Sequence, residues 1–286
     1  MAVYERTWRR YDGALTRERW RLLVITRFAL EGVFASRLFT AFYAACALPS
    51  LVGIFLVYLS HNTGLLAQLG ASSELMNRLT MAFFQKLFIW QAIPAFFLSV
   101  MIGPGLVAPD LSNSALPLYL SRPITRRDYV LGKMAVLLGL LSPVTWVGGL
   151  AVWLLQASLE RGGWWHDNLR IAVAYLVGHA IWIVVISLLS LAVSAFVRFK
   201  PLAVGALVGL YLFLGATAQA LNGITGTRAG SVLNPVAAVY VVVARIFDPV
   251  ASTDIPLWAA CLSLLATGAV SILLLNWKLR AHEVVR

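Results

Sequence analysis

Charged residues are scarce in this chain, at 12% of its 286 residues, which is about half the share in an ordinary soluble domain. Acidic residues are the scarcer kind, because 12 Asp and Glu face 23 Lys and Arg and leave a net charge of +11. A soluble nucleic-acid-binding protein with this charge would need a broad polar surface, but 60% of the residues are hydrophobic. The composition therefore excludes a soluble globular enzyme and a disordered tail, and it indicates a polytopic membrane protein.

Cysteine is nearly absent as well. Cys46 and Cys261 lie in apolar runs without a His or Cys at metal-ligand spacing, which excludes a disulfide scaffold and predicts two buried small apolar side chains.

The first 37 residues hold no short apolar core with a small-residue cleavage site, so we expect no removable signal peptide. No internal repeat is found, which argues against a secondary transporter because many of those folds carry repeats.

Long apolar runs dominate the rest of the chain. A membrane helix needs about 20 mostly apolar residues to cross about 30 Å of hydrocarbon. Six segments are this long, and they predict an all-α integral membrane fold with six transmembrane helices at 38–60, 87–107, 134–158, 171–197, 202–221 and 257–277.

A seventh apolar stretch, 232–247, is too short to cross the bilayer. It has Asn234 and Pro235 near its start and Arg245 near its end. We interpret it as re-entrant or as lying at the membrane interface.

The distribution of Lys and Arg predicts the orientation, since these residues concentrate in cytoplasmic segments. With both termini in the cytoplasm, segments 1–37 and 278–286 and the loops 108–133 and 198–201 are on the inside, and 38–277 forms the transmembrane domain. The basic residues left on the outside are then Arg78, Lys86, Arg161, Arg170, Arg228 and Arg245. Topology and contact with anionic lipid explain the positive charge without nucleic acid.

The segment 19–37 has helical spacing of apolar residues at Leu22, Ile25, Ala29 and Val33. This pattern predicts a helix that lies in the inner membrane interface. The alternative is a basic stop signal that only sets the topology.

The cytoplasmic loop reads APDLSNSALPLYLSRPITRRDYVLGK over 108–133. We expect the second span to end at Gly103-Pro104-Gly105, which cannot continue a regular helix. Ser114 is suited to cap a short helix that Ser121-Arg122-Pro123 ends. Thr125, with Asp128 three residues later, predicts a capping box at the start of the third span.

The short loop helix would present an apolar group that includes Leu116, Tyr119 and Leu120, with Arg122 and Arg126 close by. Aromatic and Arg residues are favoured at the centres of protein interfaces. We therefore interpret this helix as a docking element for a soluble partner, and the alternative is a helix that folds back onto the protein's own inner surface.

At these residues a family resemblance appears. The run Leu118-Tyr119-Leu120-Ser121-Arg122-Pro123-Ile124, followed by Tyr129-Val130-Leu131-Gly132-Lys133, resembles the cytoplasmic loop of permease subunits of type 2 ATP-binding-cassette transporters. In that family an acidic residue begins the loop, a coupling helix docks on the ATPase, and the N-terminal interfacial helix is called the elbow helix. The resemblance implies an ATPase-coupling set of Asp110, Ser114, Leu116, Tyr119, Leu120, Ser121, Arg122, Pro123 and Arg126.

The resemblance also implies the partners. A phosphate-binding loop requires G-x-x-x-x-G-K-[ST], and the one Gly-Lys pair here, Gly132-Lys133, is followed by Met134. The chain itself is thus expected to bind no cofactor, with ATP and Mg on a separate ATPase subunit present in two copies. A second permease subunit, giving a homodimer in the bacterial inner membrane, completes the expected complex.

Polar residues inside the spans are functional candidates because they are costly in lipid. His179 and Gln91 are candidates for the translocation path, and the alternative for both is a hydrogen bond that joins helices. Gly205 and Gly209 form a GxxxG pair, which favours close helix packing either within one subunit or between two. No metal site is expected.

The function that fits these observations best is the permease subunit of an ATP-driven transporter, and the resemblance favours an exporter. An integral membrane enzyme is one alternative, but Glu74, Glu160, Asp167, Asp248 and Asp254 are scattered over outer loops. A secondary transporter or channel subunit is another, and it leaves the docking-like loop helix without a role.

Overall fold

The computed structural model describes residues 21–62, 64, 81–113, 125–160, 162–197 and 199–279. Within these ranges the chain is helical and has no strand, which confirms the all-α fold. The elements are α1 (Arg21–Phe34), α2 (Arg37–Ala45), α3 (Leu48–Ser60), α5 (Met81–Ile102), α6 (Pro104–Ser112), α8 (Arg126–Ser142), the π-helical turn η3 (Pro143–Val147), α9 (Gly148–Leu159), α10 (Trp164–Asp167), α11 (Leu169–Phe196), α12 (Lys200–Thr225), the 3-10 helix η4 (Ala229–Leu233), α13 (Pro235–Phe247) and α14 (Leu257–Lys278).

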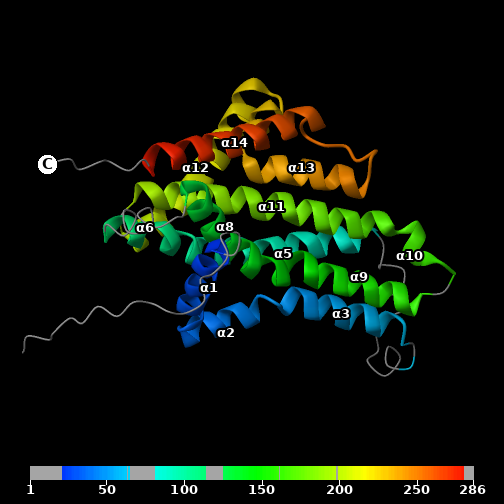
Figure 1. Cartoon of the computed structure of the whole chain (residues 1–286). Coiled ribbons are helices and arrows are strands. Elements are labelled where there is room, and N and C mark those ends of the chain that lie inside the picture. Colours follow the sequence, from blue (N-terminus) through cyan, green and yellow to red (C-terminus); the bar gives the residue numbers. More distant parts are fainter. Residues whose placement is uncertain are drawn as a thin grey trace, which may run out of the picture.

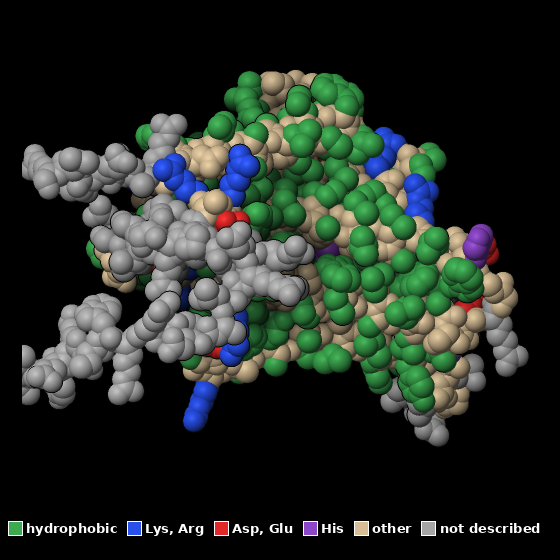
Figure 2. Space-filling model, viewed as in Figure 1, with side chains coloured by type: hydrophobic (Ala, Val, Ile, Leu, Met, Phe, Trp, Pro, Cys, Tyr) green, Lys and Arg blue, Asp and Glu red, His purple; other side chains and the backbone are tan. Residues whose placement is uncertain are grey.

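Six segments of the described chain are long and apolar enough to cross a membrane, as the sequence predicts. They are Arg37–Ser60, Met81–Ser112, Arg126–Leu159, Leu169–Phe196, Lys200–Thr225 and Leu257–Lys278. Hydrophobic side chains cover the middle of the visible face, and Lys and Arg gather towards its two ends (Figure 2). This distribution suits a protein whose middle lies in hydrocarbon.

The second span is longer than expected at both ends. It begins at Met81, and the helix resumes as α6 directly after a turn at Gly103. Pro104 stands at the start of α6, where the N–H that proline lacks has no helical partner to lose. The expected end at Gly103-Pro104-Gly105 is therefore a local break inside the segment.

A serine of the neighbouring helix α11 forms hydrogen bonds with the backbone of α6 directly after this break. Ser194 of α11 donates its hydroxyl hydrogen to the Pro104 carbonyl at 2.9 Å and accepts from the Ala108 N–H at 3.0 Å. The hydroxyl thus stands between two backbone groups that a regular helix would join directly. Gly103 packs so closely on α11 that a Cβ there would overlap the Ser190 hydroxyl.

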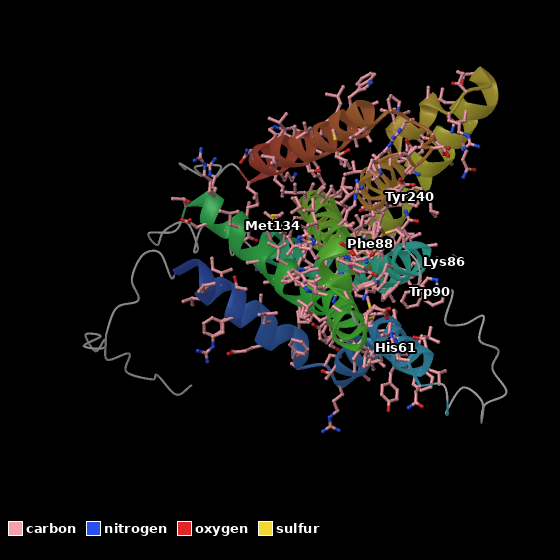
Figure 3. The ribbon with its side chains drawn as sticks, turned by 90° about the vertical axis from the view of Figure 1, so that its right-hand side faces the viewer. His61, Lys86, Phe88, Trp90, Met134 and Tyr240 are labelled. Atoms are coloured by element: carbon pink, nitrogen blue, oxygen red, sulfur yellow. The ribbon has the colours of Figure 1, made fainter. Side chains whose placement is uncertain are left out.

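Most of the helices run roughly side by side along one axis, whereas α1 crosses that axis and α12 slants away from it (Figures 1 and 3). We call one end of the bundle the basic end. It holds α1, the end of α6, the beginning of α8 and the end of α14, and the opposite end, with α10, is the far end (Figure 1).

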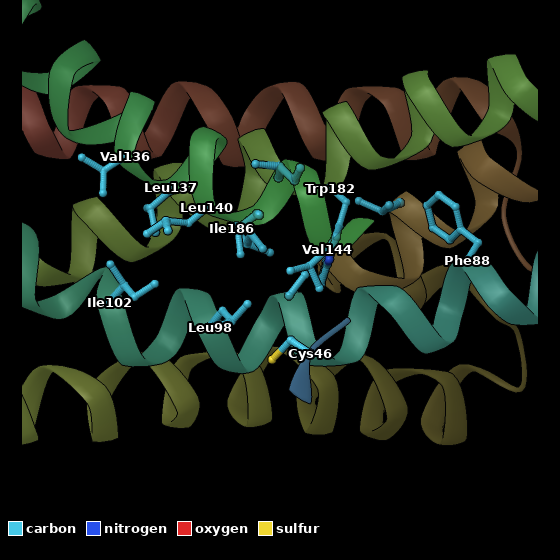
Figure 4. Close-up of a cluster of buried hydrophobic side chains, with 14 of the residues drawn as sticks. Cys46, Phe88, Leu98, Ile102, Val136, Leu137, Leu140, Val144, Trp182 and Ile186 are labelled. Carbon is cyan, nitrogen blue, oxygen red and sulfur yellow. The ribbon is translucent and has the colours of Figure 1, made fainter. Parts of the chain in front are cut away.

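The core lies around α11, which packs on α5, α6, α8, α13 and α14. Its side chains include Leu98 and Ile102 of α5, Leu137 and Leu140 of α8, and Ile186 of α11 (Figure 4). These helices are held together by tightly packed apolar side chains, the main source of attraction between helices in lipid.

The two cysteines differ in their surroundings. Cys46 is buried, as predicted, but Cys261 is exposed. The prediction for Cys261 is wrong because α14 lies at the edge of the bundle and turns much of its surface outward.

The short apolar stretch forms η4 and α13. At its start, the Val232 carbonyl accepts a hydrogen bond from Ser263, two turns into α14. At its end, Phe247 packs on Phe88 and Tyr175 near the far end. With 13 residues, α13 is about 20 Å long, which is too short to cross about 30 Å of hydrocarbon.

Candidate functional site

The basic end contains both flanks of the loop that the sequence singles out. The chain leaves α6 at Ser112 and enters α8 at Arg126. Thr125 accepts a hydrogen bond from the Asp128 N–H, and the Asp128 carboxylate accepts from the Thr125 N–H, which confirms the predicted capping box. Arg126 is exposed beside it.

The other predicted coupling residues lie outside the described residues, apart from Asp110. Those outside are Ser114, Leu116, Tyr119, Leu120, Ser121, Arg122 and Pro123. Their role in coupling stays a prediction.

Asp110 belongs to a largely buried ionic cluster at the base of this loop. Its carboxylate lies 2.8 Å from the Lys133 ammonium, with side-chain exposures of 17% and 8%. The Tyr129 hydroxyl donates to the same carboxylate oxygen at 2.8 Å. Asp110 is on α6 and the other two residues are on α8, so the cluster ties the two flanks of the loop together.

Helix α1 is attached to the same unit. The Thr26 hydroxyl donates to the Gly132 carbonyl at 3.0 Å in a buried position, and α1 packs along α8. Ala29, Leu30 and Val33 of α1 pack against the main core. The three helices α1, α6 and α8 are thus joined by polar as well as apolar contacts.

His179 and Gln91, the candidates for the translocation path, are both fully buried. Gln91 donates to the Ser50 hydroxyl of α3 at 2.8 Å, a bond that joins two helices. His179 is bonded within its own helix, with Nδ1 3.2 Å from the Tyr175 carbonyl, and its ring stacks on Phe88 at 3.8 Å. No hydrogen bond links His179 with Gln91 in the described chain.

Gly205 and Gly209 lie on an outward surface of α12. A Cβ added at either glycine would meet no atom within 4 Å, and both residues are exposed. The pair therefore does not serve close packing within the described part of this subunit. The end of α12 projects from the rest of the bundle (Figures 1 and 3).

A cavity of about 800 Å³ lies between α5, α11, α12 and α13. Lys86, Phe88 and Phe96 line it from α5, Trp182 from α11, Tyr211 from α12 and Tyr240 from α13. Its size is within the range of ligand pockets, about 300–1,000 Å³.

Sequence reasoning missed two features of this arrangement. The first is the burial of Lys133 against Asp110. Their separation in sequence gives no helical spacing, although the turn-back of the chain between the two spans is a signal that they could meet. The cavity residues Lys86 and Tyr240 come from distant segments, and only the packing of α13 beside α5 brings them to one cavity.

Comparison with known proteins gives one family. The family described as "ABC-2 family transporter protein" matches residues 23–279, from α1 to the end of α14. Among curated proteins, no match to the chain is found. The matched region contains all six candidate spans, the loop flanks and the cavity.

Proposed function

The chain belongs to the ABC-2 family of transporter proteins, and from this premise we propose that it is the membrane permease subunit of an ATP-driven exporter. In this proposal it forms the translocation path and is moved by a separate ATPase that docks on the loop 108–133. The observation that carries the proposal is the family match across all six spans, together with a loop whose two flanks are tied at the basic end.

The ATPase is proposed as a separate subunit because this sequence has no G-x-x-x-x-G-K-[ST] motif. Its Gly132-Lys133 pair lies inside α8, where the Gly132 carbonyl accepts from Thr26 and Lys133 pairs with Asp110. ATP and Mg are accordingly assigned to the partner. Two ATPase copies would serve two permease copies in a homodimer.

The proposed coupling is mechanical. ATP binding closes the two ATPase subunits, and each docked loop moves with them. Because Asp110–Lys133 links α6 to α8 and Thr26–Gly132 links α1 to α8, a displacement of the loop moves these helices as one unit. Helices α5 and α9 continue from this unit and carry the motion towards the translocation path.

The basic end is proposed to face the cytoplasm of a bacterial cell, with both termini on that side and α1 as the elbow helix in the inner interface. The direction of α1 across the bundle axis supports this placement (Figure 1). The stretch 232–247 is proposed as re-entrant, since α13 runs only from the depth of Ser263 to the far end.

The proposal is tested by expressing the chain with the soluble ATPase that we expect its neighbouring reading frame to encode. The two should copurify from membranes, and Tyr119→Ala combined with Arg122→Glu should break the association, because truncating interface anchors typically costs more than about 1 kcal/mol. Lys278→Glu, a charge reversal on exposed α14 at the same end, is the control and should leave the complex intact. Purification of the wild-type chain without any ATP-binding subunit would contradict the proposal.

A further inference from the structure

The cavity between α5, α11, α12 and α13 has a charged end and an aromatic end. Lys86 is about one and a half turns from the start of α5, near the far end of the bundle. Phe96 is ten residues further along the same helix, about 15 Å deeper at 1.5 Å per residue. The cavity is therefore elongated along the bundle axis.

Among the described residues, the charged end carries positive charge only. None of the residues that line the cavity is acidic, and no described carboxylate pairs with Lys86. The amides of Gln85 and Asn234 also line the cavity. Gln85 is the neighbour of Lys86 in α5, whereas Asn234 lies at the start of α13, towards the other end of the cavity. An ammonium group to which no described carboxylate is paired is a site for an anionic group, since charge-assisted hydrogen bonds are among the strongest.

The deep end is mostly aromatic, with the Asn234 amide at the start of α13 as a polar group beside the rings. Phe96 and Tyr211 pack edge to face with their ring centroids 4.9 Å apart, and the Trp182 indole N–H already donates to the Ala92 carbonyl. The Tyr211 hydroxyl is buried and has no hydrogen-bond partner among the described residues. The rings of Phe96, Trp182 and Tyr211 favour the hydrocarbon part of a ligand, although a hydrocarbon would leave the Tyr211 hydroxyl unbonded.

The side opening between α5 and α13 is apolar. Ile89 and Ile93 of α5 are 41% and 51% exposed, and Tyr240 of α13 is 55% exposed. Lys86 and Tyr240 lie on the same side of the bundle, with Phe88 closer to its centre (Figure 3). A ligand that enters through this opening comes from the hydrocarbon of the bilayer.

We propose that this cavity binds a single-chain anionic amphipath, with its anionic head at Lys86 and its hydrocarbon chain against Phe96, Trp182 and Tyr211. A single chain is favoured over a two-chain phospholipid because a volume of about 800 Å³ fits a drug-sized ligand. The inference rests on the proposed function, since it makes such a molecule the cargo of the exporter.

The test uses the full chain in nanodiscs of phosphatidylcholine, a net-neutral lipid, with a photoreactive 16-carbon fatty acid as the probe. The matched probe is the primary alcohol of the same chain, and adducts on residues 82–96 and 236–244 are quantified by mass spectrometry. The fatty acid should label these segments about tenfold more than the alcohol, the effect of one charge-assisted contact.

The variants locate the contact. Lys86→Gln should reduce fatty-acid labelling to the level of the alcohol, whereas Lys86→Arg should retain it. Ala237→Trp, which fills the cavity from α13, should reduce labelling by both probes. Lys278→Gln, at the basic end, is the control and should change neither.

Equal labelling of the wild type by acid and alcohol, or full labelling of Lys86→Gln, would overturn the assignment. Equal labelling by a photoreactive two-chain phosphatidic acid would overturn the single-chain class. Copurification with the ATPase is measured separately for the same variants in native membranes, so loss of that association reports on the proposed function and leaves the labelling result to decide the cavity.

Discussion

At the basic end, two opposite charges are buried in contact with each other. Taking Asp110 and Lys133 out of water is unfavourable, and their mutual attraction offsets this cost only if the remaining polar atoms are also bonded. The Tyr129 hydroxyl supplies such a bond to the carboxylate. The pair is consequently more important for holding α6 in register with α8 than for adding net stability.

Removing one charge of the pair should therefore cost more stability than removing both. Asp110→Asn leaves the Lys133 charge buried without a partner and should lower stability by about 3–5 kcal/mol. The double variant Asp110→Leu with Lys133→Met should lose much less, because it buries no charge. Thermal unfolding followed by tryptophan fluorescence measures both.

The control for this pair is Glu31→Gln, which breaks the exposed Arg27–Glu31 ion pair of α1. Exposed pairs contribute about 0–1 kcal/mol, so its effect should be small. If Asp110→Asn unfolds at the same temperature as Glu31→Gln, the buried pair does not hold the two helices together.

Ser194 should stabilise the fold through its hydrogen bonds to the backbone of α6. Ser194→Ala removes the hydroxyl that bridges the Pro104 carbonyl and the Ala108 N–H. Each buried polar group left unbonded costs about 1–3 kcal/mol, so the melting temperature should fall clearly. Ser158→Ala, which removes an exposed hydroxyl bonded only to Leu155 in its own helix, is the matched control. Equal melting temperatures for the two variants would show that the Ser194 hydroxyl does not stabilise α6 after the break at Gly103.

At the residue scale, the sequence predicts what depends on near neighbours. The Thr125–Asp128 capping box is confirmed because both partners lie within one helical turn. The surroundings of Lys133 and His179 depend on which helices pack together, and no local spacing contains that information.

At the scale of helices, the exposed Gly205–Gly209 surface of α12 is the feature that bears on assembly. Each helix in lipid packs closest where small residues let backbones approach. Since neither glycine meets another part of the described chain, we propose this surface as a contact between the two permease copies.

Replacing both glycines tests this contact. Gly205→Leu with Gly209→Leu should leave the monomer folded, because each position opens onto empty space, and should convert a homodimer into monomers by native mass spectrometry. Gly139→Leu on α8 is the control, as its Cβ would also meet nothing within 4 Å. A dimer that survives the double substitution would exclude this surface of α12 from the dimer interface.

The sequence predicts the six spans from hydrophobic length alone, and all six are found. It misjudges the end of the second span because Gly103-Pro104 breaks helices in isolation. The missing compensation comes from Ser194, which is 90 residues away in the chain. Local sequence thus determines that a helix forms. Whether the helix continues past a break depends on a contact with another helix.

At the scale of the whole molecule, the two ends of the bundle should face opposite sides of the membrane. In a background without Cys46 and Cys261, single cysteines at Ser112 and Thr227 test this arrangement, because both positions are exposed. A membrane-impermeant maleimide added to intact cells should label Thr227→Cys only, and Ser112→Cys should react after the membrane is opened. Labelling of both from outside, or of Ser112→Cys alone, would contradict the orientation.

The central claim is that the loop between α6 and α8 contacts a separate ATPase, and a cross-link tests it most directly. A photoreactive amino acid replaces Tyr119 in the full complex in native membranes, and Trp165, exposed at the far end, is the control position. We expect an adduct between position 119 and the ATPase subunit, and none from position 165. Adducts from position 119 that form only within its own chain would contradict the claim.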